Sequence, residues 1–134
     1  MTKNIVVKTR TRTEFIDITS DVKEIVSDSR IKSGVCYVYV PHTTAGVTIN
    51  EGADPDVVKD VLSTLNDLIP HNNNYLHVEG NSDAHIKTSL MGPSQAIIIE
   101  GGKLLLGTWQ AIFFCEFDGA RSRKVIVKVM RDQV

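Results

Sequence analysis

Residues 75–92 read Tyr-Leu-His-Val-Glu-Gly-Asn-Ser-Asp-Ala-His-Ile-Lys-Thr-Ser-Leu-Met-Gly, and they hold two of the four histidines of the chain. Asp83 is a good N-cap residue, because its carboxylate accepts a hydrogen bond from a free backbone N–H. The pattern predicts a short helix over residues 84–91, which Gly92 and Pro93 end. The stretch therefore predicts a polar loop that leads into a helix with a polar, chemically capable first turn.

The predicted helix has two distinct faces. His85 and Ser89 are four residues apart and share one face. Ile86 and Leu90 share the neighbouring face, and we expect them to point toward the core. The alternative is a helix-capping loop that carries His85 and its neighbour His77 as surface histidines. This stretch alone leaves both interpretations open.

Length and composition indicate one soluble globular domain over residues 1–134. The hydrophobic fraction of 42% and the charged fraction of 23% are ordinary for such a domain. The net charge of −1 argues against a general nucleic-acid or membrane-surface binder. No apolar run approaches the roughly 18 residues of a membrane span, and the N-terminal residues lack a signal-peptide core. A cytoplasmic location is the expectation.

Hydrophobic patterns predict about eight strands and three helices. Residues 4–10 and 13–18 are expected to pair as a hairpin. Residues 35–40 are apolar throughout, as in a strand covered on both faces, and Cys36 within it, like Cys115, is typical of a reduced core cysteine. Further strands are predicted at residues 47–50, 95–100, 103–106, 111–117 and 124–130.

Two more helices complete the predicted elements. One covers residues 21–31 and is capped by Thr19 or Ser20. The other has Asp54 as its N-cap and Pro55 at its first position. Eight strands and three helices in one domain predict an α+β fold built on a mainly antiparallel sheet or sandwich.

Polar side chains gather where the predicted strands end. His42 follows a buried strand, while His77 and His85 lie in the 75–92 stretch. If these ends meet, the three imidazoles could bind one metal and leave a position open, and such ligands suit zinc better than magnesium. Glu51, Asp54 or Asp83 could orient an imidazole from behind.

Other conspicuous residues have plainer interpretations. Trp109 lies in a strand-rich region and is expected in the core. Arg121 is expected either to form a salt bridge or to hold an anion. Arg123 and Lys124 are typical of a solvated hairpin end, and His71 of a solvated loop. The sequence has no Walker loop, dinucleotide fingerprint or CxxC pair.

An ordered set of short motifs resembles the YjbQ-like family of uncharacterised proteins, also known as UPF0047 and as secondary thiamine-phosphate synthases. The motifs are His42-Thr43-Thr44-Ala45, Asn50-Glu51 with Asp54-Pro55, Tyr75-x-His77, Asp83-Ala84-His85-Ile86-Lys87-x-Ser89-Leu90-x-Gly92, Gly107-Thr108-Trp109-Gln110 and Cys115-Glu116-Phe117-Asp118-Gly119-x-Arg121. They occur in the family's order over residues 35–130.

The resemblance implies an α+β homotrimer with a pocket near the subunit contacts. It implies an auxiliary activity that joins a pyrimidine pyrophosphate to a thiazole phosphate, a transferase reaction on small phosphorylated substrates. The candidate catalytic residues are then His42, Glu51 and His85, and His42, His77 and His85 are the candidate metal ligands. The candidate substrate-binding residues are Thr43, Thr44, Asn50, Lys87, Ser89, Gln110 and Arg121.

Two hypotheses of different classes follow. In the enzyme, pyrophosphate leaves the pyrimidine methylene carbon as the thiazole nitrogen attacks, and this reaction needs charge stabilisation on the leaving group more than a base. A divalent metal would be zinc on the histidines, or magnesium if it serves pyrophosphate chemistry; a metal-dependent hydrolase stays open. The alternative is a trimeric metal- or ligand-binding protein without turnover.

Overall fold

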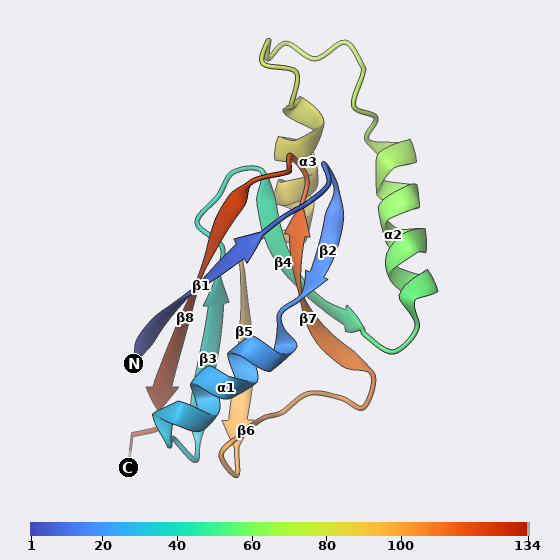
Figure 1. Ribbon diagram of the computed structural model, residues 1–134. Helices are drawn as coiled ribbons and strands as arrows, with labels where there is room; N and C mark the ends of the chain where they lie inside the picture. The colour runs from blue at the N-terminus through green and yellow to red at the C-terminus, as the bar shows by residue number, and fades with distance from the viewer. Residues whose placement is uncertain (134) are drawn as a thin grey trace.

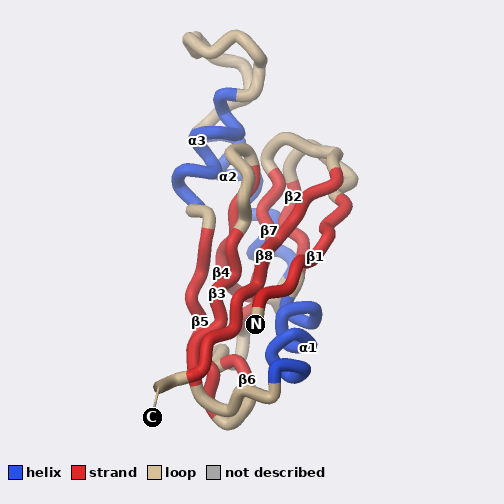
Figure 2. Tube along the Cα trace, turned by 90° about the vertical axis from the view of Figure 1, so that its left-hand side faces the viewer, coloured by secondary structure: helices blue, strands red, loops and turns tan. Residues whose placement is uncertain are grey.

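The chain folds into two antiparallel sheets and three helices (Figures 1 and 2). The computed structural model describes residues 1–133. The strands are β1 (Thr2–Lys8), β2 (Glu14–Asp17), β3 (Gly34–Tyr39), β4 (Ala45–Glu51), β5 (Ser94–Glu100), β6 (Lys103–Leu104), β7 (Gln110–Glu116) and β8 (Ser122–Arg131). The helices are α1 (Thr19–Ser29), α2 (Pro55–Leu68) and α3 (Ser82–Met91). The predicted α+β class, with eight strands and three helices, is confirmed.

The two sheets have different sizes and connect distant parts of the chain. The larger sheet has the order β1-β8-β3-β5-β6, and the smaller one has the order β2-β7-β4. The predicted hairpin of the first two strands is wrong, because β1 pairs with β8 and β2 pairs with β7. The connection between them crosses from one sheet to the other, and Glu14 fixes it by accepting the backbone N–H groups of Arg10 and Thr11 at 2.6 and 2.9 Å.

The main core lies between the sheets and is closed by α1. Alternate residues of each strand point into it, as the pleat of a half-buried strand requires. The core residues include Val22, Val26, Cys36, Val38, Val47, Ile97, Ile112, Phe114, Val125 and Val127. Cys36 and Cys115 are buried and free, as predicted, and burial raises the pKa of the Cys36 thiol to about 11.

The two sheets differ in how their outer faces are covered. Helices α2 and α3 contribute Leu65 and Ala84 to a second cluster, which packs Cys115 and Phe117 on the outer side of the smaller sheet. The larger sheet has no such layer among the described residues, so Tyr37 and Tyr39 of β3 are exposed. The prediction that residues 35–40 are covered on both faces is therefore wrong, since a tyrosine ring is apolar enough to resemble a buried residue in the sequence pattern.

The helix starts follow the predicted chemistry only at α2. Asp54 caps α2 by accepting the backbone N–H of Asp56 at 2.9 Å. The predicted caps of α1, Thr19 and Ser20, already lie inside the helix, which begins one residue after Ile18. No helix of the described residues is long and apolar enough to cross a membrane.

Helix α3 ends before Gly92 as predicted, but the face that it turns toward the protein interior is not the predicted one. Its N-cap is Asn81, not Asp83, and no side chain caps it. Ile86 and Leu90 are exposed rather than in the core. The end of the helix is held close to β4: a Cβ on Gly46 would lie 2.7 Å from the Gly92 carbonyl oxygen, so the absence of a side chain at position 46 permits this contact.

Candidate functional site

The pair of strands β4 and β7 has two ends, which carry different chemistry. At the Thr44 end, Ala45 pairs with Glu116, and at the Glu51 end, Glu51 pairs with Gln110. The strand β4 has 7 residues, so its ends lie about 20 Å apart at roughly 3.3 Å per residue.

The predicted site residues divide between these ends. His42, Thr43 and Thr44 precede β4, whereas Asn50, Glu51 and Gln110 lie at the Glu51 end. One chain therefore does not bring these two groups into one site, because the start and the end of β4 lie at opposite ends of the sheet. The remaining candidates are at or near the Thr44 end, where α3 begins.

A buried ion pair forms the floor of the Thr44 end. Arg123 donates from Nε to the Glu116 carboxylate at 2.8 Å and from Nη2 to the Thr44 hydroxyl oxygen at 2.9 Å. Thr9 also donates to Glu116 at 2.8 Å. Burial opposes ionisation of Glu116, but the hydrogen bonds from Arg123, the Asp118 N–H and Thr9 outweigh it and hold its pKa below the ordinary value. The prediction that Arg123 is solvated is wrong.

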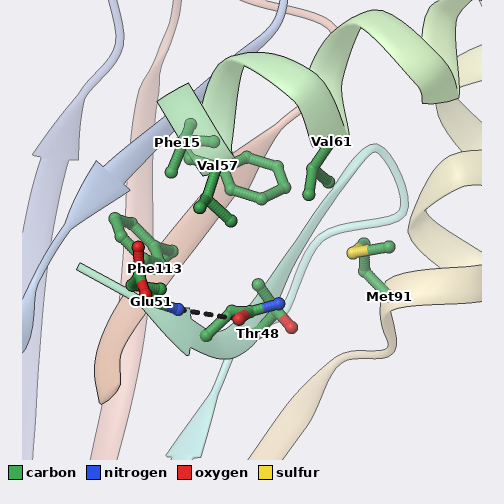
Figure 3. Close-up of a pocket in the computed structure, with 9 residues that line it drawn as sticks. Phe15, Thr48, Glu51, Val57, Val61, Met91 and Phe113 are labelled. Carbon is green, nitrogen blue, oxygen red and sulfur yellow. Dashed lines mark hydrogen bonds between the residues drawn. The ribbon is translucent and has the colours of Figure 1, made fainter. Parts of the chain in front are cut away.

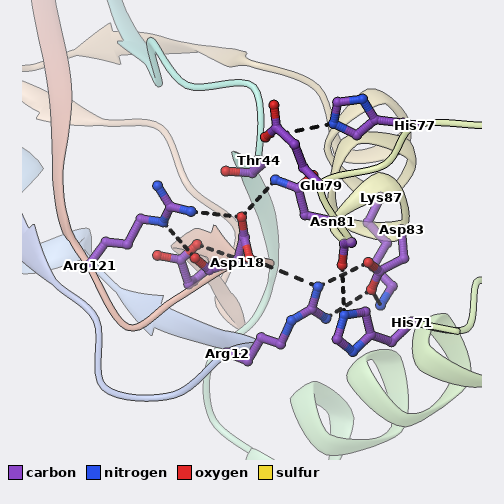
Figure 4. A network of polar contacts seen from close by, with 12 residues as sticks. Arg12, Thr44, His71, His77, Glu79, Asn81, Asp83, Lys87, Asp118 and Arg121 are labelled. Carbon is purple, nitrogen blue, oxygen red and sulfur yellow. Dashed lines mark hydrogen bonds and ion pairs between the residues drawn. The ribbon is translucent and has the colours of Figure 1, made fainter.

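A second buried carboxylate supports α3 (Figure 4). Asp83 is fully buried and accepts two hydrogen bonds from Arg12, at 2.9 and 3.0 Å, and one from Lys87 at 3.2 Å. Burial alone would raise the pKa of Asp83, but these partners lower it to about 2. Asp83 does not cap the helix, because Arg12 and Lys87 hold its carboxylate in the buried first turn.

Lys87 connects the two helices instead of facing a ligand. The Lys87 side chain is 1% exposed, and its ammonium donates to Asp83 and, at 2.7 Å, to the Asn66 side chain of α2. The predicted contact between Lys87 and a substrate phosphate is not available in this arrangement. Thr44 is likewise buried against Arg123, whereas Thr43 and Ser89 are exposed.

Asp118 organises the surface of the Thr44 end. Its carboxylate accepts hydrogen bonds from Asn81 at 3.0 Å and from Arg121 at 2.8 Å, and the Arg121 Nε also donates to the Asp118 carbonyl at 2.7 Å. The Arg121 side chain is 53% exposed. The salt bridge predicted for Arg121 is thus present, and the same guanidinium keeps donors turned toward solvent. In Figure 4, Arg121 and Arg12 approach Asp118 from different sides.

The histidines divide into a pair and a single residue. The rings of His77 and His85 lie edge to face with centroids 5.4 Å apart, and Glu79 lies 3.8 Å from His77. His42 instead accepts the Lys124 backbone N–H through Nε2 at 3.0 Å. Burial and then the nearby Arg123 charge lower the pKa of His42, and protonation of Nε2 would also remove the hydrogen bond from Lys124.

A resident metal does not fit the side chains that one chain supplies. No group of three or more His, Cys, Asp or Glu side chains within residues 1–133 is arranged to hold a metal ion. His77 and His85 provide two imidazoles, while Nε2 of His42 is already occupied as an acceptor. A metal centre with three protein ligands would therefore need its third ligand from another chain.

Sequence reasoning missed the charged residues that build this end. Arg12, Glu116 and Arg123 were not among the candidates, although a carboxylate inside the apolar run 111–117 was a usable signal, since buried charges need partners. The prediction that Trp109 lies in the core is wrong: the residue is 64% exposed at the Glu51 end, where its carbonyl accepts the Gly52 N–H at 2.8 Å.

The fold and the arrangement of the Thr44 end define a class of α+β proteins with two antiparallel sheets. The family model described as UPF0047 protein YjbQ-like matches residues 3–132. The chain belongs to this YjbQ-like family.

Relatives and solved structures agree over nearly the whole chain. A UPF0047 protein of Methanocaldococcus jannaschii is 57% identical over 95% of this chain and 92% of its own length. The UPF0047 protein YugU of Bacillus subtilis is 50% identical over 97% and 99%. A crystal structure of a family member from Clostridium acetobutylicum has a TM-score of 0.94 at 57% identity and covers 96% of this chain and 99% of that one. A protein of unknown function from Sulfolobus solfataricus has a TM-score of 0.95 at 32% identity, with 98% and 97% covered.

Proposed function

We propose that this chain is a cytoplasmic transferase of the thiamine-phosphate synthase type, and that its phosphorylated substrate binds at the Thr44 end. The observation that carries the proposal is the exposed Arg121 guanidinium, which Asp118 holds in place beside the start of α3. A fixed guanidinium binds phosphate oxygens with two parallel hydrogen bonds at a small entropic cost.

The start of α3 supports an anion site in the same place. The first N–H groups of a helix lack helical partners and carry a partial positive charge. No side chain caps α3. The negative charge of Asp83 in the first turn is offset by Arg12 and Lys87. The Ala84 N–H already donates to the Asn81 carbonyl at 3.0 Å, so the N–H groups of Ser82 and Asp83 are the donors that remain. The helix's own carboxylate does not neutralise them, and pyrophosphate is the kind of group that such donors bind.

The reaction proposed here depends on leaving-group stabilisation. As the thiazole nitrogen forms its bond to the methylene carbon, the carbon–oxygen bond breaks and the electron pair goes to pyrophosphate. Arg121, Thr43 and the α3 N–H groups would take up this charge. His42 suits a neutral hydrogen-bonding role, because its pKa is lowered by burial and by the charge of Arg123.

We propose a divalent metal only in the assembled oligomer, because one chain does not supply enough ligands for it. His77 and His85 would be two of its ligands, and a second copy would have to supply another. Zinc matches imidazole ligands better than magnesium does. None of the steps above depends on this ion.

Homotrimeric assembly is also proposed, and the outer face of the larger sheet supports an interface between copies. That face carries exposed apolar side chains on four neighbouring strands: Val6, Tyr37, Tyr39, Ile98 and Met130. An apolar face of this extent is typical of a protein contact. The measured solution mass should be about three times the 14.8 kDa of one chain, and a monomer at micromolar concentration would contradict the assembly.

The activity is tested by mixing the protein with hydroxymethylpyrimidine pyrophosphate and thiazole phosphate and measuring thiamine phosphate by mass spectrometry. Arg121→Ala should lower kcat/KM by about a hundredfold, because an oriented charge-stabilising donor is lost. Arg10→Ala is the matched control, since Arg10 is also exposed. Equal losses in both variants, or no product from the wild-type protein, would rule out the proposed role.

A metal-dependent hydrolase is the second candidate, favoured by the His77–His85 pair with Glu79 beside it. Metal analysis of the purified protein and phosphate release from simple phosphate esters test it. Pyrophosphate binding by calorimetry without turnover of either kind would instead identify a non-catalytic binding protein.

A further inference from the structure

Two hollows of the molecule lie outside the Thr44 end, and their walls differ in chemistry. The hollow beneath α2 has a volume of about 80 Å³, and Phe15, Val57, Val61, Met91 and Phe113 give it a mainly aromatic and aliphatic wall (Figure 3). The hollow between α1 and the turn from β5 to β6 has a volume of about 530 Å³ and is lined by Lys23, Val26, Ser27, Lys32, Gly101, Gly102, Lys103 and Leu104. This second hollow, the lysine cleft, has the size of a small-molecule site.

The floor of the lysine cleft is the edge of the main core. Val26 of α1 and Leu104 of β6 are both buried core residues that line it. Lys103 alternates with Leu104 along β6, so its side chain points to the other face of the sheet and it contributes backbone to the cleft. In Figure 1, α1 and β6 lie at the opposite end of the molecule from α3.

Two lysines reach the cleft from different segments of the chain. On α1, Lys23 lies three residues before Val26 and four before Ser27, so it shares a helix face with these two lining residues. Lys32 follows the helix, and its carbonyl accepts the Gly102 N–H at 3.0 Å. A Cβ on Gly102 would lie only 3.3 Å from the Lys32 Nζ, so the glycine leaves room for this ammonium beside the turn.

The positive charge of these two lysines is not neutralised locally. In the part of the chain that the structure describes, no ion pair engages Lys23 or Lys32, and no Asp or Glu lines the cleft. Glu24 and Asp28 each follow a cleft-lining residue of α1 by one position, which turns them about 100° further around the helix, away from the core and the cleft. The cleft therefore combines an apolar floor with two unpaired cations.

We propose that the lysine cleft binds a small organic phosphate monoester, with its phosphate at the ammonium groups of Lys23 and Lys32 and its hydrocarbon part on Val26 and Leu104. Lysine binds phosphate as a point charge, and a phosphate monoester carries close to two negative charges at pH 7.5, so it uses both cations. A neutral molecule of the same shape gains the apolar contacts alone. The cleft is separate from the phosphate site proposed at the Thr44 end.

The test uses n-butyl phosphate as the probe, with 1-butanol and inorganic phosphate as its neutral and its purely ionic counterparts. The chain has 9 glycines, so protein labelled with ¹⁵N-glycine gives a simple NMR spectrum. The Gly101 and Gly102 amide signals should shift saturably with n-butyl phosphate at pH 7.5 and low salt, with a dissociation constant on the order of millimolar for so small a ligand. Gly119, next to Asp118, reports binding at the Thr44 end in the same spectrum.

Charge recognition is measured by comparing ligands and variants. The Gly102 titration should give about tenfold tighter binding of n-butyl phosphate than of 1-butanol. Lys23→Gln and Lys32→Gln should each weaken n-butyl phosphate binding about threefold, and the double variant about tenfold, as expected for exposed ion pairs. Lys128→Gln, an exposed lysine of β8, is the matched control and should bind as wild type.

Three outcomes overturn the proposal: no saturable shift of Gly101 and Gly102, equal affinity for n-butyl phosphate and 1-butanol, or wild-type affinity in the double variant. Equal affinity for inorganic phosphate and n-butyl phosphate would overturn the role of the apolar floor. A shift confined to Gly119 would also overturn the proposal, while supporting the site at the Thr44 end. Neither lysine takes part in the proposed transferase reaction, so the two proposals fail independently.

Discussion

The two ends of the β4–β7 pair handle a carboxylate in opposite ways. At the Thr44 end, Glu116 is fully buried and bound by Arg123 and Thr9. At the Glu51 end, Glu51 is half-buried at the end of β4, and no ion pair within residues 1–133 engages its carboxylate. The difference teaches that charge content alone does not mark function: a buried charge with a full set of partners maintains the structure, whereas a charge at a strand end needs no such partners because it reaches water.

The largest effect is expected from breaking the buried pair. Arg123→Met should lower the free energy of unfolding by about 3–5 kcal/mol, because Glu116 would remain as an uncompensated buried charge. Urea denaturation at pH 7 measures the loss. Arg121→Met is the matched control and should lose far less, since that guanidinium is largely exposed. If the two variants lose similar amounts of unfolding free energy, the buried Arg123 is no more important for stability than the exposed Arg121.

Acid should weaken the Thr44 end through Asp83. The pKa of Asp83 is lowered from 3.8 to about 2, so its contribution is complete above the unfolded pKa and is lost as pH falls from about 4 toward 2. The contribution is on the order of 2 kcal/mol. Urea denaturation of the wild type at pH 5 and pH 3 should show this decrease, and the decrease should be smaller in Asp83→Asn. An identical pH dependence in the variant would assign the acid sensitivity to other groups.

His85→Ala tests whether the histidine pair is functional or structural. His85 is half-buried and contacts His77 edge to face, so its loss should cost about 1 kcal/mol or less. Metal or ligand binding should nevertheless be abolished, as measured by calorimetry. Ser89→Ala, on the same helix face, should retain binding. Unfolding of His85→Ala would instead make His85 a scaffold residue.

The smallest effect on stability is expected at the Glu51 end. Trp109→Ala should change the free energy of unfolding by about 0.5 kcal/mol, as for other surface positions, because Trp109 is 64% exposed. Phe114→Ala, in the main core, should cost about 3–5 kcal/mol. Thermal unfolding of the two variants gives the comparison. A large loss for Trp109→Ala would indicate that a second copy of the chain buries this ring.

The sequence predicted local elements well and their partners poorly. The Asp54-Pro55 start of α2, the Gly92 end of α3 and the Gly101-Gly102 turn, with φ of 59° and 77°, are all confirmed. Turn and cap chemistry is local, so neighbouring residues determine it. The β1–β2 hairpin was wrong because strand pairing depends on residues about 100 or more positions apart, and no periodicity in one strand specifies its partner.

The candidate site was only partly accessible to sequence reasoning. The motifs correctly indicated His77 and His85 as neighbours of one helix start. They also grouped Glu51 and Gln110 with His42, because a sequence motif contains no distance across a strand. Arg123 was misjudged for a related reason: a cation looks solvated in a sequence until its buried carboxylate partner is known. Lys87, predicted as a phosphate contact, has a buried carboxylate partner of its own in Asp83.

The sequence by itself determined the α+β class, the positions of most helices and strands, and the family, since these follow from periodicity, turn residues and ordered motifs. Only the tertiary structure decided which charges are satisfied and which are free. Glu116 and Glu51 are the same residue type on, respectively, β7 and β4. Their chemistry differs because folding places Arg123 against Glu116 and leaves Glu51 without an ion pair within residues 1–133, and the energy of a charge depends on its surroundings in space.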